Sequence, residues 1–173
     1  MSSQRMAIRQ AIVNAIKDKT DAGAMVAANR ILPVWQSELP LIIVYTKDES
    51  ATVYDETPLL YQRKLKIAIE IAAELADGVD DELDTIADQV ETVLKQDFNL
   101  GGLCRDVLYQ QTEIEFFDDG KDPIAACRLT YEITYFSDGV ADESALTDLK
   151  EVNGNIQNPT TGDEMPFDIS IPT

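Results

Sequence analysis

The chain has 173 residues, of which 45% are hydrophobic and 27% charged, a composition typical of a soluble globular protein that builds an ordinary apolar core. Its 14 basic and 32 acidic side chains give a net charge of −18, which excludes a site that grips nucleic-acid phosphates through an excess of Lys and Arg. The absence of histidine excludes Ser-His-Asp triads, Cys-His pairs and imidazole metal ligands.

The first predicted element is a helix over residues 4–18, where apolar side chains recur at helical spacing and Ser2 or Ser3 precedes them as an N-cap. Residues 30–35 follow as a short extended piece, which their proline confines to a sheet edge. Residues 41–45 form a continuous apolar run rich in β-branched side chains, which favours a strand buried on both faces.

Residues 46–62 show no clear period, and we interpret them as a long excursion between strands, a kind of connection that often carries function. Strict alternation returns in residues 64–71. The apolar side chains of this stretch share one face, and the opposite face carries Lys64, Lys66 and Glu70. The alternation predicts a strand with one packed face and one face in water.

A second helix is predicted to open at Asp80, after the break at Gly78, because apolar residues up to Leu94 form a helical stripe. Its first turn is crowded by four acidic residues, Asp80, Asp81, Glu82 and Asp84. A helix dipole favours negative charge at this end, so we read the cluster as an N-cap with an acidic first turn. A divalent-cation site is the alternative interpretation.

Two further strands are predicted over residues 107–117 and 124–136, where apolar and polar side chains alternate. They form an antiparallel hairpin whose turn carries Asp118, Asp119 and Asp122. We interpret these three acids as turn residues rather than as a metal loop.

The period is lost beyond Ser137, where Gly and Pro accumulate. It returns at the end of the chain as a lone strand pattern, in which polar residues alternate with Phe167, Ile169 and Ile171. A single strand cannot stabilise itself, so this segment is predicted to add to a sheet edge of its own fold or of a neighbour, with a frayed tail as the alternative. The predicted architecture is an α+β domain, residues 1–137, with a mainly antiparallel sheet and two principal helices packed on it, followed by an extended acidic C-terminal arm, residues 138–173.

Cys104 and Cys127 stand 23 positions apart without the spacing of a zinc site, and they are predicted to be buried, reduced thiols. No apolar stretch approaches the roughly 18 residues of a membrane span. The N-terminus lacks the continuous hydrophobic region of a secretory signal. We therefore expect a cytosolic protein at birth that is not secreted and needs no metal, disulfide or cofactor.

The charge is divided unevenly along the chain. Residues 1–70 hold nine basic and eight acidic side chains, whereas residues 71–173 hold five basic and 24 acidic ones. Nearly all the negative charge therefore belongs to the second part, which is expected to form a solvated face or a surface that repels polyanions.

Four stretches of the sequence, taken in their order and spacing, resemble one known family. They are residues 30–46 (RILP…ELPLIIVYT), 63–70 (RKLKIAIE), 83–91 (LDTIA…VE) and 126–135 (ACRLTYEITY). They resemble a phage tail terminator, the minor tail protein U type of long-tailed phages and prophages. The resemblance covers about residues 5–137, and the C-terminal segment fits it only loosely.

The resemblance implies a structural protein of the virion with no catalytic residues and no cofactor. Tail terminators assemble in the host cytoplasm as hexameric rings on the finished end of the tail tube, stop its polymerisation and present a surface to the head-side connector. The implied partners are further copies of the chain, the tail tube protein and the head–tail connector protein, and DNA passes through the ring without specific binding.

Three groups of residues are candidates for these contacts. Lys64, Lys66 and Glu70 are predicted to contact a neighbouring subunit, since they lie in the nearly neutral part of the chain and face away from the core. Asp118, Asp119 and Asp122 are predicted to face the lumen or rim of the ring. Phe167, Ile169 and Ile171 are predicted to dock as an arm.

Three alternatives remain at this point. An acidic inhibitor that mimics DNA would share this composition, as a monomer or dimer with an exposed acidic stripe. A neighbouring head–tail connector or completion protein would share the tail role. An enzyme that uses two carboxylates, such as a glycosidase, would need a cleft about 5–9.5 Å across, and nothing in the sequence places a pair of acids in this way.

Overall fold

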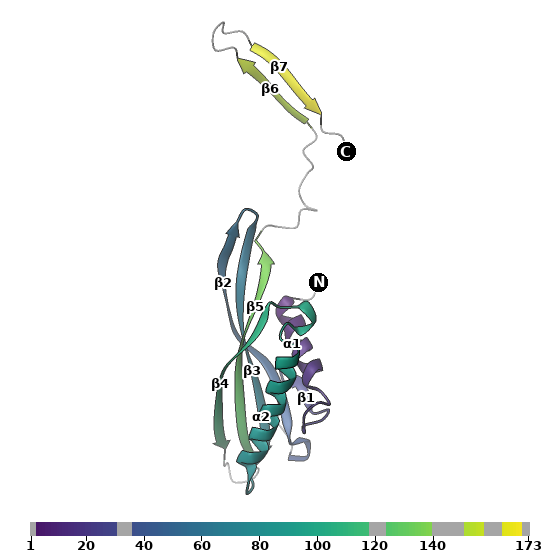
Figure 1. Ribbon diagram of the computed structural model, residues 1–173, viewed down its shortest axis with the longest axis vertical. Coiled ribbons are helices and arrows are strands. Elements are labelled where there is room, and N and C mark those ends of the chain that lie inside the picture. The colour runs from purple at the N-terminus through teal and green to yellow at the C-terminus, as the bar shows by residue number, and fades with distance from the viewer. Residues whose placement is uncertain (1–2, 31–35, 118–123, 140–150, 158–163, 171–173) are drawn as a thin grey trace. The chain divides into compact units, whose positions relative to one another are not determined.

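Two units make up the chain in the computed structural model, which describes residues 3–30, 36–117, 124–139, 151–157 and 164–170 (Figure 1). The first unit spans Met1–Gly139 and the second spans Val140–Thr173. Each unit has its own sheet. The first contains both helices and is described first.

A five-stranded sheet is the frame of the first unit (Figure 1). The strand order is β1-β2-β3-β5-β4, in which β1 is parallel to β2 and the other neighbouring pairs are antiparallel. The strands are β1 (Val26–Ala28), β2 (Leu41–Glu56), β3 (Leu59–Glu74), β4 (Asp106–Phe117) and β5 (Ile124–Asp138). The predicted α+β class with a mainly antiparallel sheet is confirmed.

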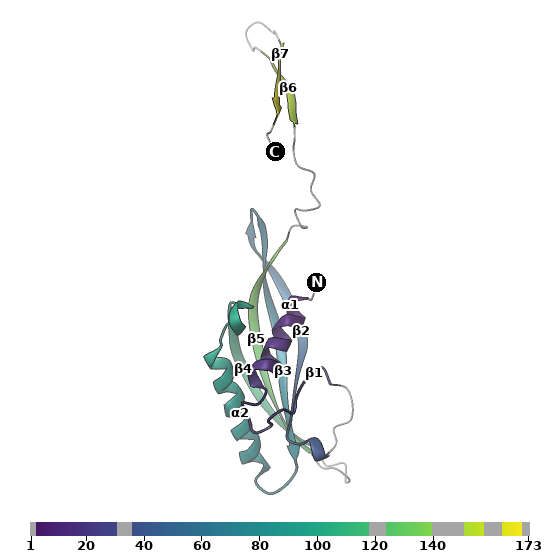
Figure 2. The same cartoon turned by 90° about the vertical axis from the view of Figure 1, so that its right-hand side faces the viewer.

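Two helices, α1 (Gln4–Ile16) and α2 (Val79–Gln96), cover one face of this sheet (Figures 1 and 2). Their apolar stripes meet the inward side chains of β2, β3 and β5 in one core, in which Ile8 and Ile12 of α1 and Leu83 and Ile86 of α2 are fully buried. Both helices confirm the sequence prediction. Their burial against the sheet, rather than propensity alone, is what stabilises helices of this length.

The helix ends differ in detail from the prediction. Ser3 is the N-cap of α1, but its side chain makes no capping hydrogen bond. α2 begins at Val79, one residue before the predicted start, because Gly78 adopts the left-handed conformation (φ 84°) that a side chain would disfavour. Asp80, Asp81 and Glu82 lie in the first turn of α2, as expected, whereas Asp84 lies beyond it and no side chain caps the helix.

The alternation predicted for residues 64–71 is confirmed within β3. Leu65, Ile67, Ile69 and Ile71 have no exposed surface and point into the core below the helices. The opposite side is wet at Lys64 and Lys66, but Ala68 on that side is buried as well. Small side chains between longer charged ones explain this, since the longer chains cover them.

The prediction of an irregular excursion over residues 46–62 is wrong. These residues are the outer halves of β2 and β3, which form one long antiparallel hairpin. The register shifts between Thr46 and Asp48 and between Val53 and Asp55, so two bulges reverse the inward and outward alternation. Because residues 51–56 are also exposed on both faces, no apolar period marks them as a strand.

Two other expectations for this region need correction. In residues 41–45, Ile42 and Val44 are fully buried under the helices, but Ile43 and Tyr45 on the other side are partly exposed, so the strand is not buried on both faces. The edge strand next to β2 is Val26–Ala28, a short strand parallel to it, and β4 lies at the opposite edge. Residues 31–35 of the predicted edge piece lie outside the described residues.

The second predicted hairpin is confirmed as β4 and β5, which pair from Asp106 and Thr134 to Phe117 and Ile124. Between α2 and β4 the chain turns through a short 3-10 helix, η2 (Leu100–Gly102). A second 3-10 helix, η1 (Gln36–Glu38), precedes β2. Cys104 and Cys127 are buried and free, as predicted.

The second unit is a two-stranded antiparallel sheet of β6 (Glu151–Gln157) and β7 (Glu164–Ser170). The strand predicted at the end of the chain is present as β7, and it pairs with β6, a strand that the sequence did not predict. Phe167 stands opposite Gly154 and Ile169 opposite Val152. A glycine between two asparagines depletes β6 of strand-forming side chains, and for this reason its sequence did not predict a strand.

Candidate functional site

The face of the sheet that the helices leave uncovered carries a ladder of charged side chains, and we call this surface the open face. It is built from cross-strand neighbours on β2, β3, β5 and β4. Its charged members are Asp48, Lys64, Lys66, Glu70, Glu113, Arg128 and Glu132. All three residues predicted as a subunit interface therefore lie on one surface.

Each predicted interface residue also has a partner within the chain. Lys64 Nζ lies 2.8 Å from Glu132 Oε1, and Lys66 Nζ lies 3.7 Å from Asp48 Oδ1. The hydrogen bond to Glu132 raises the pKa of Lys64, so this ammonium stays charged at neutral pH. Both lysine side chains remain 48% exposed, which leaves room for a second acidic partner.

Glu70 is held more firmly than the two lysines. Its Oε2 accepts hydrogen bonds from Arg128 Nη2 at 3.2 Å and from the Tyr45 hydroxyl at 3.0 Å. Partial burial and the nearby Glu70 carboxylate raise the pKa of Tyr45, which keeps this hydroxyl protonated as a donor. Glu70 thus ties β2, β3 and β5 together and is better described as a structural member of the open face than as a free contact residue.

A second feature is the outer edge of β4, which the sequence did not single out. All of residues 108–117 are exposed, and we call this strand segment the β4 edge. Its large apolar residues include Leu108, Tyr109, Ile114, Phe116 and Phe117. Their alternation predicted a strand but could not tell an edge strand from a central one.

A third feature lies on the helix-covered side, where β2, β3 and β5 extend beyond the core. Glu49 accepts hydrogen bonds from Arg63 at 3.1 Å and from the Tyr135 hydroxyl, and Arg5 lies 3.8 Å away. Burial and the Glu49 carboxylate raise the pKa of Tyr135 to about 12. This cluster fixes the base of the long β2–β3 hairpin; sequence reasoning missed it because Glu49 sits in the stretch without a visible period.

For the remaining predicted site residues, the structure gives only part of their positions. Asp118, Asp119 and Asp122, and Ile171, lie outside the described residues. Phe167 and Ile169 belong to β7, so two of the three docking residues lie in a paired strand rather than a lone one.

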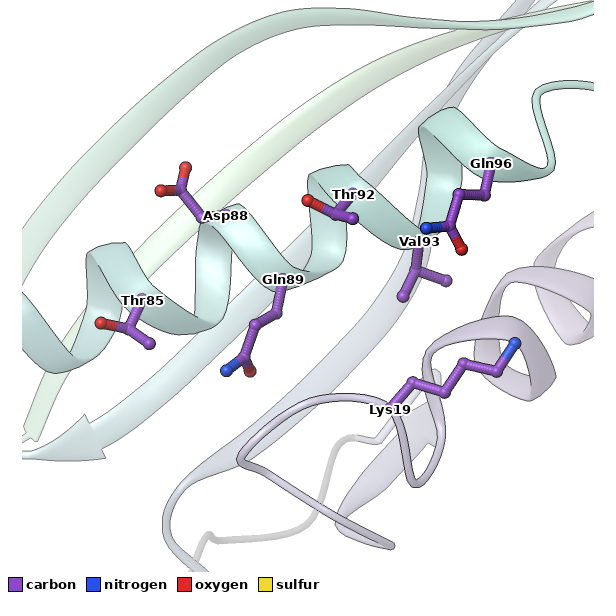
Figure 3. A pocket seen from close by; sticks show the side chains of 7 residues that line it. All are labelled: Lys19, Thr85, Asp88, Gln89, Thr92, Val93 and Gln96. Atoms are coloured by element: carbon purple, nitrogen blue, oxygen red, sulfur yellow. The ribbon is translucent and has the colours of Figure 1, made fainter.

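The surface groove in Figure 3, with a volume of about 520 Å3, runs beside α2 and is lined by Lys19, Thr85, Asp88, Gln89, Thr92, Val93 and Gln96. Gln89 and Val93 point toward the segment that carries Lys19, whereas Asp88 points away from it (Figure 3). The backbone N–H of Asp21 donates to Gln89 Oε1 at 2.8 Å, so this amide closes one side of the groove. A lysine, a single carboxylate and neutral amides and hydroxyls do not make a pair of catalytic acids.

Metal ligands, reactive thiols and membrane-spanning helices are further features that a functional site can have. No group of three or more Cys, Asp or Glu side chains is close enough to hold a metal ion there. Burial raises the pKa of Cys127 to about 11 and that of Cys104 to about 12, so neither thiol is an activated nucleophile at neutral pH. No helix in this part of the chain has the length and apolar character that crossing a bilayer requires.

Comparison with known proteins identifies one family. The family model described as phage minor tail protein U matches residues 3–135, which include both helices and nearly all of the five-stranded sheet. A search of curated proteins finds no match.

Proposed function

The chain belongs to the phage minor tail protein U family and is a structural component of the phage tail, and on that premise we propose that it forms a ring that caps the tail tube. In this role it ends tail-length growth and offers the surface on which head and tail join. The ring is built from copies of this chain, most simply six, and acts without catalysis or a cofactor. The observation that carries the proposal is the family match over residues 3–135.

The open face supports a contact between neighbouring copies. Residues 1–70 are nearly neutral and contribute Lys64 and Lys66, whereas residues 71–173 carry the net negative charge of the chain. A head-to-tail contact joins unlike surfaces and closes into a ring when the rotation between subunits allows it. Acids of one subunit would then share the half-exposed lysines of the next with Glu132 and Asp48.

The net charge of −18 supports a ring through which DNA passes without binding. A channel lined with one sign of charge repels a polyanion of the same sign. We assign Asp118, Asp119 and Asp122 to this lumen or its rim.

The second unit is assigned to contacts outside the ring. An isolated two-stranded hairpin is marginally stable in water, so β6 and β7 need a surface to pack against. We propose that Phe167, Ile169 and Ile171 dock on the tail tube protein or the head–tail connector protein.

Negative-stain images and native mass measurement of the purified protein test the ring. A six-fold particle with a central pore supports the proposal. A monomer or dimer at every concentration, with binding to a DNA-binding protein instead of tail tubes, would favour the acidic DNA mimic.

A tube-growth assay separates a terminator from a neighbouring connector protein. The purified protein is added to the cognate tail tube protein during polymerisation. A terminator shortens the tubes and is found at one end of each. A connector leaves tube length unchanged, and that outcome would contradict the capping role.

A further inference from the structure

The β4 edge is a free hydrogen-bonding edge. Among the described residues β4 pairs with β5 alone, so the backbone N–H and C=O groups on its other side have no strand partner. Soluble proteins usually protect such edges with lysine, proline or a very short strand. β4 has twelve residues and contains neither lysine nor proline.

The side of the β4 edge that faces the helix layer is mostly apolar, with Thr112 opposite Leu129 as its polar member. Tyr109, Ile114 and Phe116 stand opposite the core residues Tyr131, Cys127 and Ala125 of β5. They continue the core face one strand further, yet they remain 44%, 40% and 55% exposed. The sheet therefore extends past its helical cover and offers apolar contact area to one more strand.

Both flanks of this apolar strip are acidic. On the open face, Glu113 and Glu115 alternate with the apolar residues, and Arg128, which is already bound to Glu70, lies 3.9 Å from Glu113. On the helix side, Asp84 and Glu91 of α2 lie close enough to raise the pKa of Cys127 and Tyr131, respectively, and Glu91 is itself paired with Lys95 Nζ at 2.8 Å. A strand that adds to β4 meets negative charge on each side.

We propose that the β4 edge is the docking site for an extended segment of another virion protein, in which lysine or arginine alternates with apolar residues. Its backbone would pair with β4, its apolar side chains would cover Tyr109, Ile114 and Phe116, and its cations would oppose Glu113 and Glu115. This inference rests on the proposed function, which places the chain among other tail proteins.

Charge argues against a second copy as the occupant. The run in which cations alternate with apolar residues, residues 63–67, already lies in the centre of the sheet as part of β3. The strands of the second unit carry Glu151, Glu164 and Asp168, and like charges across a strand pair are destabilising. A partner of different sequence therefore fits this edge better than these segments of a second copy do.

The test uses the full-length protein and a nine-residue capped peptide that alternates lysine and valine, at physiological salt. We expect it to bind at least tenfold more tightly than the glutamate–valine peptide, and to slow amide hydrogen exchange in residues 108–117. A lysine–valine peptide that is N-methylated at every residue should bind at least tenfold more weakly, because it cannot donate backbone hydrogen bonds.

A pair of matched variants separates docking from general attraction to an acidic protein. E113K/E115K should reverse the preference between the lysine and glutamate peptides. D55K/E56K, which makes the same change of charge at the tip of the β2–β3 hairpin, should leave the affinity within twofold. Equal loss in both variants, equal binding of the N-methylated peptide, or no binding would overturn the proposal.

Sedimentation of the same samples distinguishes this inference from the proposed function. Rings that form without peptide binding would reject the docking site but not the ring. Peptide binding without rings would support the docking site and contradict the ring. If the amides of residues 108–117 are already protected in the ring and exposed in the monomer, a second copy occupies the β4 edge and the inference is wrong.

Discussion

Lys64 and Lys66 show how pairing within a chain changes the meaning of an exposed charge. Each lysine has an acidic partner on the adjacent strand, Glu132 and Asp48, so neither is an isolated contact residue. Exposed ion pairs of this kind contribute about 0–1 kcal/mol to stability. Their main effect on an interface is on orientation and association rate.

The variant K64E/K66E is expected to hinder ring assembly more than it lowers the stability of the monomer. It places like charges opposite Glu132 and Asp48 and also repels the acids of a neighbouring copy. Assembly is measured by sedimentation at low and moderate salt, and stability by urea denaturation. K64Q/K66Q removes the cations without adding cross-strand repulsion and is the matched control. Unchanged ring formation in both variants would reject the open face as a subunit contact.

The two buried thiols are expected to make the fold sensitive to alkali. Their pKa values are raised from the usual 9.0 to about 11 for Cys127 and about 12 for Cys104, so the unfolded chain loses these protons first. The stability present below pH 9 should therefore fall as the pH rises toward 11, by up to about 1.4 kcal/mol per pH unit for each thiol.

Urea denaturation of the wild-type protein and C127A between pH 8 and 11 measures this effect. The alanine variant loses packing at every pH, but its free energy of unfolding should fall less steeply above pH 9. Parallel curves for the two proteins would show that the Cys127 thiol ionises equally in both states.

At the scale of elements, the end of β5 depends on a close approach between two strands. The backbone N–H of Gly139 donates to the Leu59 carbonyl at 2.8 Å, and a Cβ at position 139 would overlap the side chains of Leu59 and Tyr61. The glycine therefore lets the chain after β5 lie beside the start of β3 without a clash.

G139A is expected to destabilise the first unit by about 1–3 kcal/mol, the usual range for overpacking. In an L59A background the cost should be at least halved, because the clashing side chain is shortened. Thermal denaturation of the four proteins of this cycle measures the coupling. Additive effects would mean that the backbone moves aside at position 139.

Sequence periodicity predicted the elements that pack one face against the core. α2, the inner half of β3 and β5 each carry an unbroken apolar period, and each was predicted within a few residues. The outer half of β2 was missed, since two bulges reverse its alternation and no core selects apolar residues there. β6 was missed because its partner strand, rather than its own side chains, defines it.

The open face was partly predicted from the sequence, whereas the β4 edge was not. The sequence predicted that Lys64, Lys66 and Glu70 share a face, because strand alternation is local. Their partners Glu132, Asp48 and Arg128 come from other strands, and only the register of the sheet reveals them. Strand order likewise determines that β4 lies at an edge, and alternation carries no information about strand order.

At the scale of the whole molecule, the two units should be separable. A chain that ends after Gly139 keeps the entire core and should unfold within about 2 °C of the full-length protein. A truncation that removed residues 155–173 would instead cut through β6 and leave an unpaired part of the strand. The chain is therefore ended at Gly139, before the hairpin. Calorimetry of the truncated protein measures this.

Complementation of a terminator-defective phage with the truncated protein tests the second unit. We expect soluble protein, normal rings and a reduced virion yield, because attachment to the tube or connector is weakened. Normal yield would show that the second unit is dispensable for assembly. Insoluble protein would show that residues 140–173 contribute to folding of the first unit.

Neutralisation of the predicted lumen acids is the corresponding test of the channel. D118N/D119N/D122N should leave folding and ring formation unchanged, since the turn predicted at these residues from the sequence tolerates polar substitution. If these acids line the channel, the variant rings should retain short DNA in a filter-binding assay at low salt, whereas wild-type rings do not. Equal retention by both rings would remove these acids from the lumen.

The central position of β3 has a consequence for how the protein is made. β3 pairs with β2, which precedes it, and with β5, whose first residue lies fifty positions beyond Glu74. At about 5–20 residues per second, the ribosome needs roughly 3–10 s to supply those residues. During that time one edge of β3 and the apolar face of the nascent β2–β3 hairpin lack most of their partners. Slow translation should therefore lengthen the period in which the nascent chain is prone to aggregate, and chaperones that bind nascent chains should raise its soluble yield.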